Sequence, residues 1–327
     1  MAEFVDTPEN PAPAWGKAET LVARDGLPIR YGLFPAQSGP RKGSVIILTG
    51  RNECIEKYFE TIRDLSDRGF GSAIMDWRGQ GGSGRMLRNP QRGYVRSFDQ
   101  YAADLEQFLT EVVLADCRPP YYLLAHSTGA VVALMSAPAL LNRVNRMVLI
   151  APLIELSGQP LPQKWIRRLT GLLRLVGLGS LYVSGGARPK GGYPFADNKL
   201  TTDVARFTRN NAIYDAAPQL SLGGPTVAWI HAASVAADRI RDPDLMGSIH
   251  LPALMIAAGA DEVVDTGAVE AYARRLRSGS LLTIDGARHE ILQEADVYRE
   301  QFWAAFDAFI PGEDPDALAG IVRAGFR

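Results

Sequence analysis

Cysteine and histidine are scarce in this chain, whose 327 residues include two cysteines and four histidines. Cys54 and Cys117 cannot build a disulfide framework, so we expect a reducing compartment. An excess of either charge is also missing, because 35 Lys and Arg oppose 36 Asp and Glu, which leaves a net charge of -1. This balance argues against nucleic-acid binding, which needs a basic surplus on one face. Hydrophobic residues make up 46%, which excludes intrinsic disorder.

Long uninterrupted apolar runs are absent as well. Pro119–Asn142 and Ala216–Ala237 contain no Asp, Glu, Lys or Arg and are long enough to span a bilayer, but Pro, Gly, Ser or His interrupts both. Met1–Trp15 is acidic and Pro-rich and lacks the basic and apolar regions of a signal peptide. We therefore expect a soluble, cytoplasmic protein that does not span a membrane.

Apolar patterns typical of strands and helices alternate along much of the chain. Two β-prone runs, Thr20–Ala23 and Leu27–Phe34, flank a turn at Asp25-Gly26 and predict a hairpin at a sheet edge. Buried-strand patterns follow, separated by helical stripes, and predict an α/β fold with a mostly parallel sheet and helices on both faces. These predicted strands are Ser44–Leu48, Ser72–Asp76, Tyr121–Ala125, Met147–Ala151, Leu251–Ala258 and Leu281–Ile284.

The alternation stops near Leu153 and resumes at Leu251. The residues between them are mostly compatible with helix and are punctuated by Gly and Pro, so we interpret them as an inserted, mainly helical cap. The predicted organisation is a leader at 1–19, a core at 20–154 and 241–312, a cap at 155–240 and a tail at 313–327.

One short motif predicts a nucleophile. Ala125-His126-Ser127-Thr128-Gly129 stands between a predicted strand and an apolar helix. It matches the G-x-S-x-G elbow with Ala in place of the first Gly, where small residues let the strand and helix approach closely. Ser127 is thus the candidate nucleophile; the alternative is a serine that only caps the helix.

A serine nucleophile needs a general base, and the four histidines allow elimination. His126 lies inside the elbow, His231 in the cap, and His250 at the wrong end of a strand. His289 follows the last predicted strand, at the sheet edge where catalytic groups collect in open α/β sheets, and is the candidate base.

The orienting carboxylate should follow the preceding strand. Asp261 comes two residues after Gly259, immediately beyond the strand end, and is the leading candidate. Asp265 is a plausible helix cap, Glu262 should point to solvent, and Asp285 is a local alternative.

The loop after Ser44–Leu48 supplies a candidate anion site. In a fold of this kind one oxyanion N–H comes from that loop and the other from the residue after the nucleophile, which predicts the backbone amides of Arg51 and Thr128. The alternative for the side chains of Arg51 and Glu53 is a surface ion pair.

Gly79–Gly84 reads G-x-G-x-x-G, but no helix opens within it, since Pro90 lies in the loop that follows. We expect a tight turn and no dinucleotide site. No metal or organic cofactor is required by the predicted chemistry.

These motifs together resemble the α/β-hydrolase superfamily, and more narrowly its bacterial lysophospholipase and monoacylglycerol-lipase branch. The most specific stretch is Gly50–Leu109, with GRNECIEKY and MDWRGQGGSGR. The resemblance covers about Ser44–Ile154 and Leu251–Phe309. It implies an α/β-hydrolase fold, a catalytic triad of Ser127, Asp261 and His289, and an oxyanion hole at Arg51 and Thr128. Thr49 stands where many relatives have His, and Ala125 replaces the first elbow Gly.

The predicted cap is basic and apolar. Glu155–Leu200 holds seven basic and two acidic residues, about +5, so that the rest of the chain is about -6. Such a lid would suit an acyl chain with an anionic or polar head at a membrane surface. Glu53, Trp165, Leu169 and Leu172 are predicted to line the substrate pocket. In the alternative, the apolar side packs on the core and the arginines are solvated.

The sequence thus predicts a serine hydrolase that cleaves carboxylic esters through an acyl-enzyme, acting on lysophospholipids or monoacylglycerols. A short-chain carboxylesterase or a peptidase with the same triad is the alternative among enzymes. A catalytically silent member of the fold that binds a small ligand or a partner is the non-enzymatic alternative.

Overall fold

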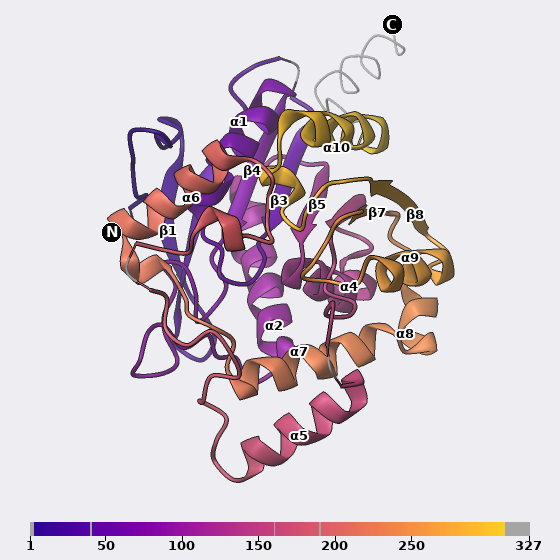
Figure 1. Cartoon of the computed structure of the whole chain (residues 1–327). Helices are drawn as coiled ribbons and strands as arrows, with labels where there is room; N and C mark the ends of the chain where they lie inside the picture. The colour runs from indigo at the N-terminus through magenta and orange to yellow at the C-terminus, as the bar shows by residue number, and fades with distance from the viewer. Residues whose placement is uncertain (1–2, 40, 160, 190, 311–327) are drawn as a thin grey trace, which may run out of the picture.

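An eight-stranded sheet forms the centre of the computed structural model, which describes residues 3–39, 41–159, 161–189 and 191–310 (Figure 1). The strand order is β1-β2-β4-β3-β5-β6-β7-β8. β2 pairs antiparallel with β1 at the sheet edge and with β4 on its other side, and all the pairs from β4 to β8 are parallel. The strands are β1 (Lys17–Val22), β2 (Pro28–Phe34), β3 (Gly43–Leu48), β4 (Phe70–Met75), β5 (Tyr121–His126), β6 (Arg146–Ile150), β7 (Ala253–Ala258) and β8 (Gly279–Ile284).

Helices cover both faces of the sheet, as the alternating pattern predicts. In Figure 1, α1 and α10 lie above the sheet, and α2, α4 and α9 lie below it. The central strands β3, β4 and β5 are buried along their whole length, which explains their continuous apolar runs. The bounds of these helices are α1 (Phe59–Asp67), α2 (Phe98–Phe108), α4 (Thr128–Leu140), α9 (Thr266–Arg275) and α10 (Asp296–Phe309). Shorter helical segments are η1 (Ile55–Tyr58), η2 (Leu109–Val113), α3 (Leu114–Asp116) and η5 (Ile291–Gln293).

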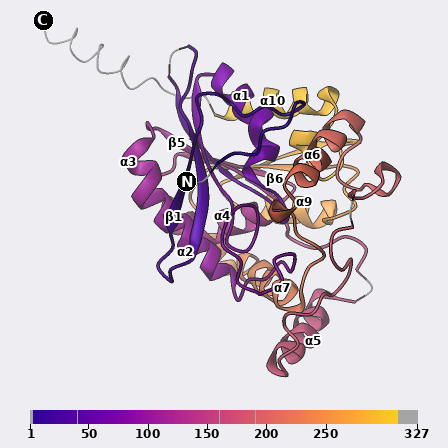
Figure 2. The ribbon, with the colours of Figure 1, turned by 90° about the vertical axis from the view of Figure 1, so that its left-hand side faces the viewer.

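The chain between β6 and β7 is helical. Its elements are α5 (Gln163–Leu175), η3 (Phe195–Asp197), α6 (Val204–Ala216), η4 (Pro218–Leu220), α7 (Val227–Ile240) and α8 (Pro243–Ser248). Buried residues of α7, including Trp229, Ala232 and Ala236, belong to the same hydrophobic cluster as the sheet. α5 packs on the other side of α7 and is the outermost helix at the lower end of the molecule (Figure 2).

The N-terminal segment differs from the predicted leader at 1–19, because β1 already begins at Lys17. Phe4 stacks on Phe34 with ring centroids 5.2 Å apart, and the Val5 N–H donates to Glu56. Aromatic packing therefore attaches this segment to the core, a contact that a Pro-rich composition does not reveal. The predicted tail at 313–327, and the last two residues of the predicted core, lie outside the described residues.

Among the residues that the structure describes, no helix combines the length and the apolar character needed to cross a bilayer.

Candidate active site

Ser127 occupies a strained turn between β5 and α4. Its φ of 50° and ψ of -108° lie in a region that residues with a side chain rarely adopt. A Cβ on Gly129 would lie 2.3 Å from the carbonyl oxygen of Leu48, so this position has room only for glycine. Ala125, which replaces the other small residue of the motif, is fully buried. The elbow predicted from sequence is therefore present, and its two small residues lie where strand and helix meet.

A chain of hydrogen bonds links Ser127 to His289 and Asp261. Nε2 of His289 lies 3.1 Å from Oγ of Ser127, and Nδ1 lies 2.8 Å from Oδ2 of Asp261. Both ring nitrogens are thus used, and the geometry suits a base that takes a proton from the serine hydroxyl. The three residues come from the loops after β5, β7 and β8, all at the carboxyl edge of the parallel strands.

Backbone groups hold the Asp261 carboxylate in place. Its Oδ1 accepts the N–H groups of Val263 and Val264 at 2.7 and 3.0 Å. Burial alone would raise the pKa of this carboxyl, but His289 and the two N–H groups bring it below its ordinary value. Asp261 is therefore present as an anion able to stabilise a charged imidazole.

The neighbouring carboxylates are occupied elsewhere. Asp265 caps α9 by accepting the N–H of Ala268 at 2.7 Å, the role proposed for it from sequence. Glu262 pairs with Lys199 at 3.5 Å on an exposed surface. Neither forms a hydrogen bond with His289 within the described part of the chain.

The predicted anion-binding amides belong to segments that face the same cavity as Ser127. Arg51 follows β3, and Thr128 begins α4, where the first N–H groups have no acceptor within the helix. A Cβ on Gly50 would lie 2.8 Å from Nδ1 of His126 and 2.9 Å from Oε2 of Glu53, so glycine lets this loop approach both side chains.

A buried polar cluster beneath the site was not predicted from sequence. Glu53 does not form the surface ion pair with Arg51 that was the alternative from sequence; its carboxylate is buried and accepts the Tyr58 hydroxyl at 2.7 Å. Lys57 lies 3.2 Å from Glu53 and 2.7 Å from Glu290. The only sequence signals were the i,i+4 spacing of Glu53 and Lys57 and the position of Glu290 beside His289.

His126 connects this cluster to the loop of His289. Its Nδ1 lies 3.2 Å from Oε2 of Glu53, and its Nε2 lies 3.2 Å from the carbonyl oxygen of His289. Burial would lower the pKa of His126, but the charge of Glu53 raises it above its ordinary value. Burial likewise opposes ionisation of Glu53, yet Lys57 and His126 hold its pKa well below the usual range. Because Glu53 also accepts the Gly50 N–H, the cluster joins both loops of the site.

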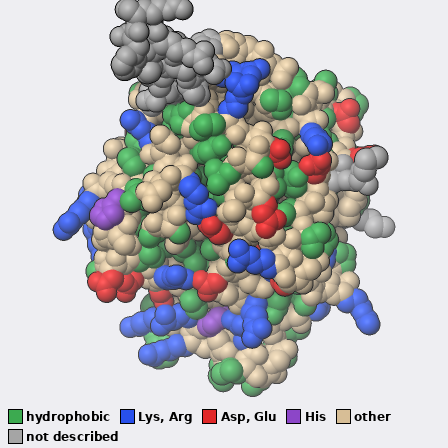
Figure 3. Space-filling view, turned by 180° about the vertical axis from the view of Figure 1, so that it is seen from behind, with side chains coloured by type: hydrophobic (Ala, Val, Ile, Leu, Met, Phe, Trp, Pro, Cys, Tyr) green, Lys and Arg blue, Asp and Glu red, His purple; other side chains and the backbone are tan. Residues whose placement is uncertain are grey.

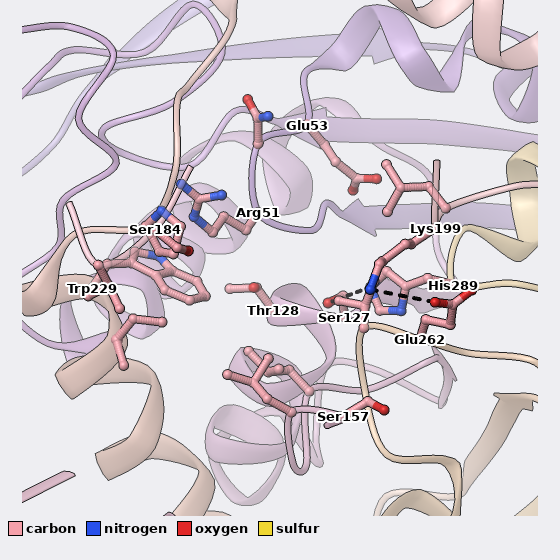
Figure 4. A pocket seen from close by; sticks show the side chains of 18 of the residues that line it. Arg51, Glu53, Ser127, Thr128, Ser157, Ser184, Lys199, Trp229, Glu262 and His289 are labelled. Carbon is pink, nitrogen blue, oxygen red and sulfur yellow. Dashed lines mark hydrogen bonds and ion pairs between the residues drawn. The ribbon is translucent and has the colours of Figure 1, made fainter. Parts of the chain in front are cut away.

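A cavity of about 1010 Å³ opens above Ser127 (Figure 4). Glu53 and Leu169 line it as predicted, together with Ile166, Leu173, Ile230 and other apolar side chains. Trp165 and Leu172 do not line this cavity. The prediction for these two residues was wrong because the face of α5 turned to the cavity is centred on Ile166, Thr170 and Leu173, with Leu169 at its edge.

The glycines of Gly79–Gly84 form a turn, and no helix starts within it. The Gly79 N–H donates to the carbonyl of Gly84 at 2.9 Å, and the Gly82 N–H donates to the Asp76 carboxylate at 2.7 Å. That carboxylate is buried and accepts from Arg30. The turn therefore helps to hold the Asp76 carboxylate in its buried ion pair with Arg30.

Comparisons with known proteins show the family of this chain. Residues 39–296 match the model of the family described as serine aminopeptidase, S33. The chain is 31% identical over 285 residues to lysophospholipase L2 of Escherichia coli (strain K12), and the aligned region covers 84% of this chain and 82% of that protein. It is 30% identical over 282 residues to the probable lysophospholipase L2 of Haemophilus influenzae, covering 85% and 86%.

A solved structure shows the same fold. The soluble variant of monoglyceride lipase from Saccharomyces cerevisiae, in complex with a substrate analogue, superposes with a TM-score of 0.71 at 20% identity. The match covers 90% of this chain and 96% of that one. The chain therefore belongs to the serine aminopeptidase S33 family of α/β-hydrolases, in its lysophospholipase and monoacylglycerol-lipase branch, and is a hydrolase of the esterase and lipase type.

Proposed function

We propose that Ser127, His289 and Asp261 form a catalytic triad that cleaves the ester of a single-chain lipid. The observation that carries this proposal is the continuous hydrogen-bond chain of 3.1 and 2.8 Å from the serine through the histidine to the carboxylate. The strained φ of Ser127 supports it further, since such strain persists only where the surroundings enforce it.

The proposed reaction has two stages. His289 takes the Ser127 proton while Oγ attacks the ester carbonyl carbon, and the backbone N–H groups of Arg51 and Thr128 stabilise the oxyanion. The tetrahedral intermediate collapses to an acyl-enzyme, and His289 returns the proton to the departing alcohol. Water then attacks the acyl carbonyl carbon while His289 takes its proton, and His289 returns that proton to Oγ of Ser127 as the carboxylic acid leaves. Asp261 keeps the imidazole oriented and stabilises its charged form.

The size and lining of the cavity support a lipid acyl chain. About 1010 Å³ exceeds what an acetyl or butyryl ester fills, and most of the wall contributed by α5 and α7 is apolar. The relatives named as lysophospholipases support the same assignment. Lysophospholipids and monoacylglycerols both carry one acyl chain, and they are the proposed substrates.

A fluorophosphonate probe tests the nucleophile. We expect it to label the wild-type enzyme and not Ser127→Ala, and we expect Ser127→Ala to lose ester hydrolysis by at least about a thousandfold. Ser136→Ala is a matched control: it changes a serine of the same helix, α4, whose Oγ has no hydrogen-bond partner in the described structure. Labelling of Ser127→Ala at the wild-type rate would refute the triad, and a wild-type enzyme that resists the probe would favour a silent binding protein.

Chain length tests the substrate class. We expect kcat/KM for p-nitrophenyl esters to rise from acetate to the longer acyl chains, because the apolar wall of the cavity gains contact with each added methylene. Activity confined to acetate and butyrate would instead identify a short-chain carboxylesterase.

We also propose that residues 155–240 act as a cap on a core of 20–154 and 241–312, and that α5 contacts an anionic lipid surface. Its outer face exposes Trp165, Leu172 and Leu175, the last of them 86% exposed. Figure 3 shows hydrophobic side chains at the lower end of the molecule with Lys and Arg beside them. Basic side chains on this helix complement an anionic bilayer; they are Lys164, Arg168 and Arg174, whereas Arg167 pairs with Asp238 of α7.

Vesicle sedimentation tests this contact. We expect binding to vesicles that contain phosphatidylglycerol, weaker binding to pure phosphatidylcholine, and a several-fold loss of binding in Leu175→Asp. Val297→Asp, which changes an exposed valine on α10, is the control. Equal binding of Leu175→Asp and wild type would exclude α5 as the contact surface.

A further inference from the structure

Arg51 is a half-buried cation beside the candidate nucleophile. Its backbone follows β3, and its side chain lines the same cavity as Ser127. In Figure 4 the guanidinium lies with Ser184 and Trp229 on one side of the cavity, opposite Lys199 and His289. Nη2–H donates to the carbonyl of Gly223 at 2.6 Å, and the group stacks on the Trp229 ring at 5.3 Å.

No carboxylate pairs with Arg51 in the part of the chain that the structure describes. The ionisable groups whose charges act on it are tyrosines: Tyr101, Tyr193 and Tyr182. Its Nε is buried and has no hydrogen-bond partner. Burial lowers the pKa of the guanidinium to about 10, which is the direction expected when a buried cation has no counter-ion. A half-buried charge without a counter-ion is unfavourable in the free protein, and an anion bound there would relieve that cost.

The other charged groups of the cavity wall are already matched. Lys57 pairs with Glu53 and Glu290, and Lys199 pairs with Glu262. Among the described residues of the cavity wall, the positive charges without an acidic partner are therefore those of Arg51 and of one further residue, Arg188.

Arg188 lines the same cavity and also has no acidic partner among the described residues. Its Nη2–H donates to Oδ1 of Asn211 at 2.6 Å, its backbone N–H donates to Gln91 at 2.8 Å, and its guanidinium lies 4.9 Å from the Tyr214 ring centroid. These neutral partners fix the position of the side chain without cancelling its charge. The Tyr182 hydroxyl, which also belongs to the cavity wall, is a buried donor without a partner.

We propose that Arg51 and Arg188 form a phosphate-binding subsite that selects the phosphodiester headgroup of a lysophospholipid over the neutral glycerol of a monoacylglycerol. The proposal rests on the function proposed above and narrows its substrate. Guanidinium groups bind phosphate oxygens with planar, charge-assisted hydrogen bonds, which suits an anion that carries one charge.

The position of Arg51 agrees with the reaction geometry. Its own backbone N–H is the proposed donor to the ester oxyanion, so its side chain starts next to the reacting carbonyl. In a lysophospholipid the phosphate is joined to the ester by the short glycerol unit. One residue can therefore hold the oxyanion with its main chain and the headgroup with its side chain.

Paired substrates of equal acyl length test the subsite. We expect Arg51→Met to lower the ratio of kcat/KM for lysophosphatidylcholine to kcat/KM for monoacylglycerol by about ten- to hundredfold, because one or two charge-assisted hydrogen bonds are lost. The change should appear mainly as a higher KM for the lysophospholipid, and Arg51→Lys should restore part of the ratio. Arg188→Met should lower the ratio as well. Arg274→Gln, an exposed arginine of α9, should leave the ratio unaltered.

A second experiment tests the subsite with the wild-type enzyme alone. Glycerophosphocholine should inhibit hydrolysis of a neutral p-nitrophenyl ester competitively, and glycerol at the same concentration should not. Inhibition by inorganic phosphate without inhibition by glycerophosphocholine would assign the site to free phosphate and overturn the headgroup proposal.

The outcomes separate the two proposals. If the fluorophosphonate labels Ser127 but the substrate ratio is the same in wild type and Arg51→Met, the subsite is refuted while the triad stands. An equal fall in kcat/KM for both substrates would show that Arg51 acts only through the structure of its loop, and this result also overturns the subsite. If Ser127→Ala keeps full activity, the proposed function itself fails.

Discussion

The two carboxylate oxygens of Asp261 together determine which ring nitrogen of His289 carries the proton. Oδ1 is held by the N–H groups of Val263 and Val264, and Oδ2 faces Nδ1 of His289. Because a carboxylate only accepts hydrogen bonds, Nδ1 must carry the proton, and Nε2 is left free to accept from Ser127. A single carboxylate therefore determines both the orientation and the tautomer of the imidazole.

Replacing this carboxylate by an amide is predicted to impair the chemical step. Asp261→Asn can present an N–H to Nδ1, which favours the tautomer with its proton on Nε2 and removes the acceptor for the serine. We expect kcat for a p-nitrophenyl ester to fall by about a thousand- to ten-thousandfold. Steady-state kinetics measures the loss, and thermal unfolding followed by circular dichroism shows whether the variant is folded.

Asp265→Asn is the matched control at the same loop. Asn is also a good N-cap residue, so α9 should lose little stability and activity should be close to that of wild type. If Asp261→Asn kept more than a tenth of the wild-type kcat, Asp261 could not be the orienting carboxylate.

At the scale of elements, the close contact between α4 and β3 decides the position of the nucleophile. A Cβ on Gly129 would approach the carbonyl oxygens of Leu48 and Thr49 to 2.3 and 2.7 Å. Leu48 also pairs with Ala125 in the sheet, so β3, β5 and α4 meet at one point. A displacement of α4 there would move Ser127 away from His289.

Gly129→Ala is therefore predicted to destabilise the protein, although alanine favours helix. We expect the overpacking to outweigh the helix propensity and to lower the free energy of unfolding by about 1–3 kcal/mol. The rate of fluorophosphonate labelling should fall as well. Chemical denaturation gives the first quantity, and a labelling time course gives the second.

Gly247→Ala supplies the contrast. Gly247 lies in α8, and a Cβ there meets nothing within 4 Å. This variant should be neutral or more stable by up to about 1 kcal/mol. If both variants were equally stable, close packing would not be the reason for glycine at 129.

At the scale of the whole molecule, an ion cluster ties the segment between β6 and β7 to the core. Glu60 on α1 accepts from Arg206 at 2.7 Å and Arg209 at 2.5 Å, both on α6, and from Arg299 on α10 at 2.6 Å. Burial opposes ionisation of Glu60, but these arginines bring its pKa down to about 2. One carboxylate thus joins three helices that are distant in sequence.

This cluster predicts a loss of stability in acid. A carboxyl whose folded pKa is lowered stabilises the fold fully above its unfolded value of 4.5, and that contribution is lost as the pH falls from there through about 2. Solvent screening of a partly exposed group reduces the contribution to on the order of 2 kcal/mol. Urea unfolding at several pH values measures it.

Glu60→Gln should be less stable than wild type at pH 7 and should lose less stability between pH 4.5 and 2. Glu300→Gln, an exposed glutamate of α10, should follow the wild-type curve. Parallel curves for wild type and Glu60→Gln would show that Glu60 does not carry this pH dependence.

Much of the fold could be predicted because it is encoded locally. The continuous apolar run at Ser44–Leu48 corresponds to β3, and the run at Leu251–Ala258 contains β7. The Asp25-Gly26 turn separates the antiparallel strands β1 and β2 as expected. Periodicity and turn chemistry act over a few residues, so a single sequence reports them.

The substrate side of the site was less predictable. Trp165, Leu169 and Leu172 form one apolar stripe of α5, yet of these three only Leu169 lines the cavity. The rotation of α5 about its axis depends on how that helix packs on α7, and residues far apart in the chain decide this packing.

By itself, the sequence determined the order of the catalytic groups: a serine in a strand-to-helix turn, then an aspartate and a histidine after later strands. These residues follow strand ends, and parallel strands bring their carboxyl ends together. Only the tertiary structure decided the charges around them. The sequence left open a surface ion pair between Glu53 and Arg51, but Glu53 is buried among Lys57, Tyr58 and His126. Arg51 has no carboxylate partner among the described residues. Charge pairing depends on distances between residues from different loops and on their burial, and neither is written in local sequence.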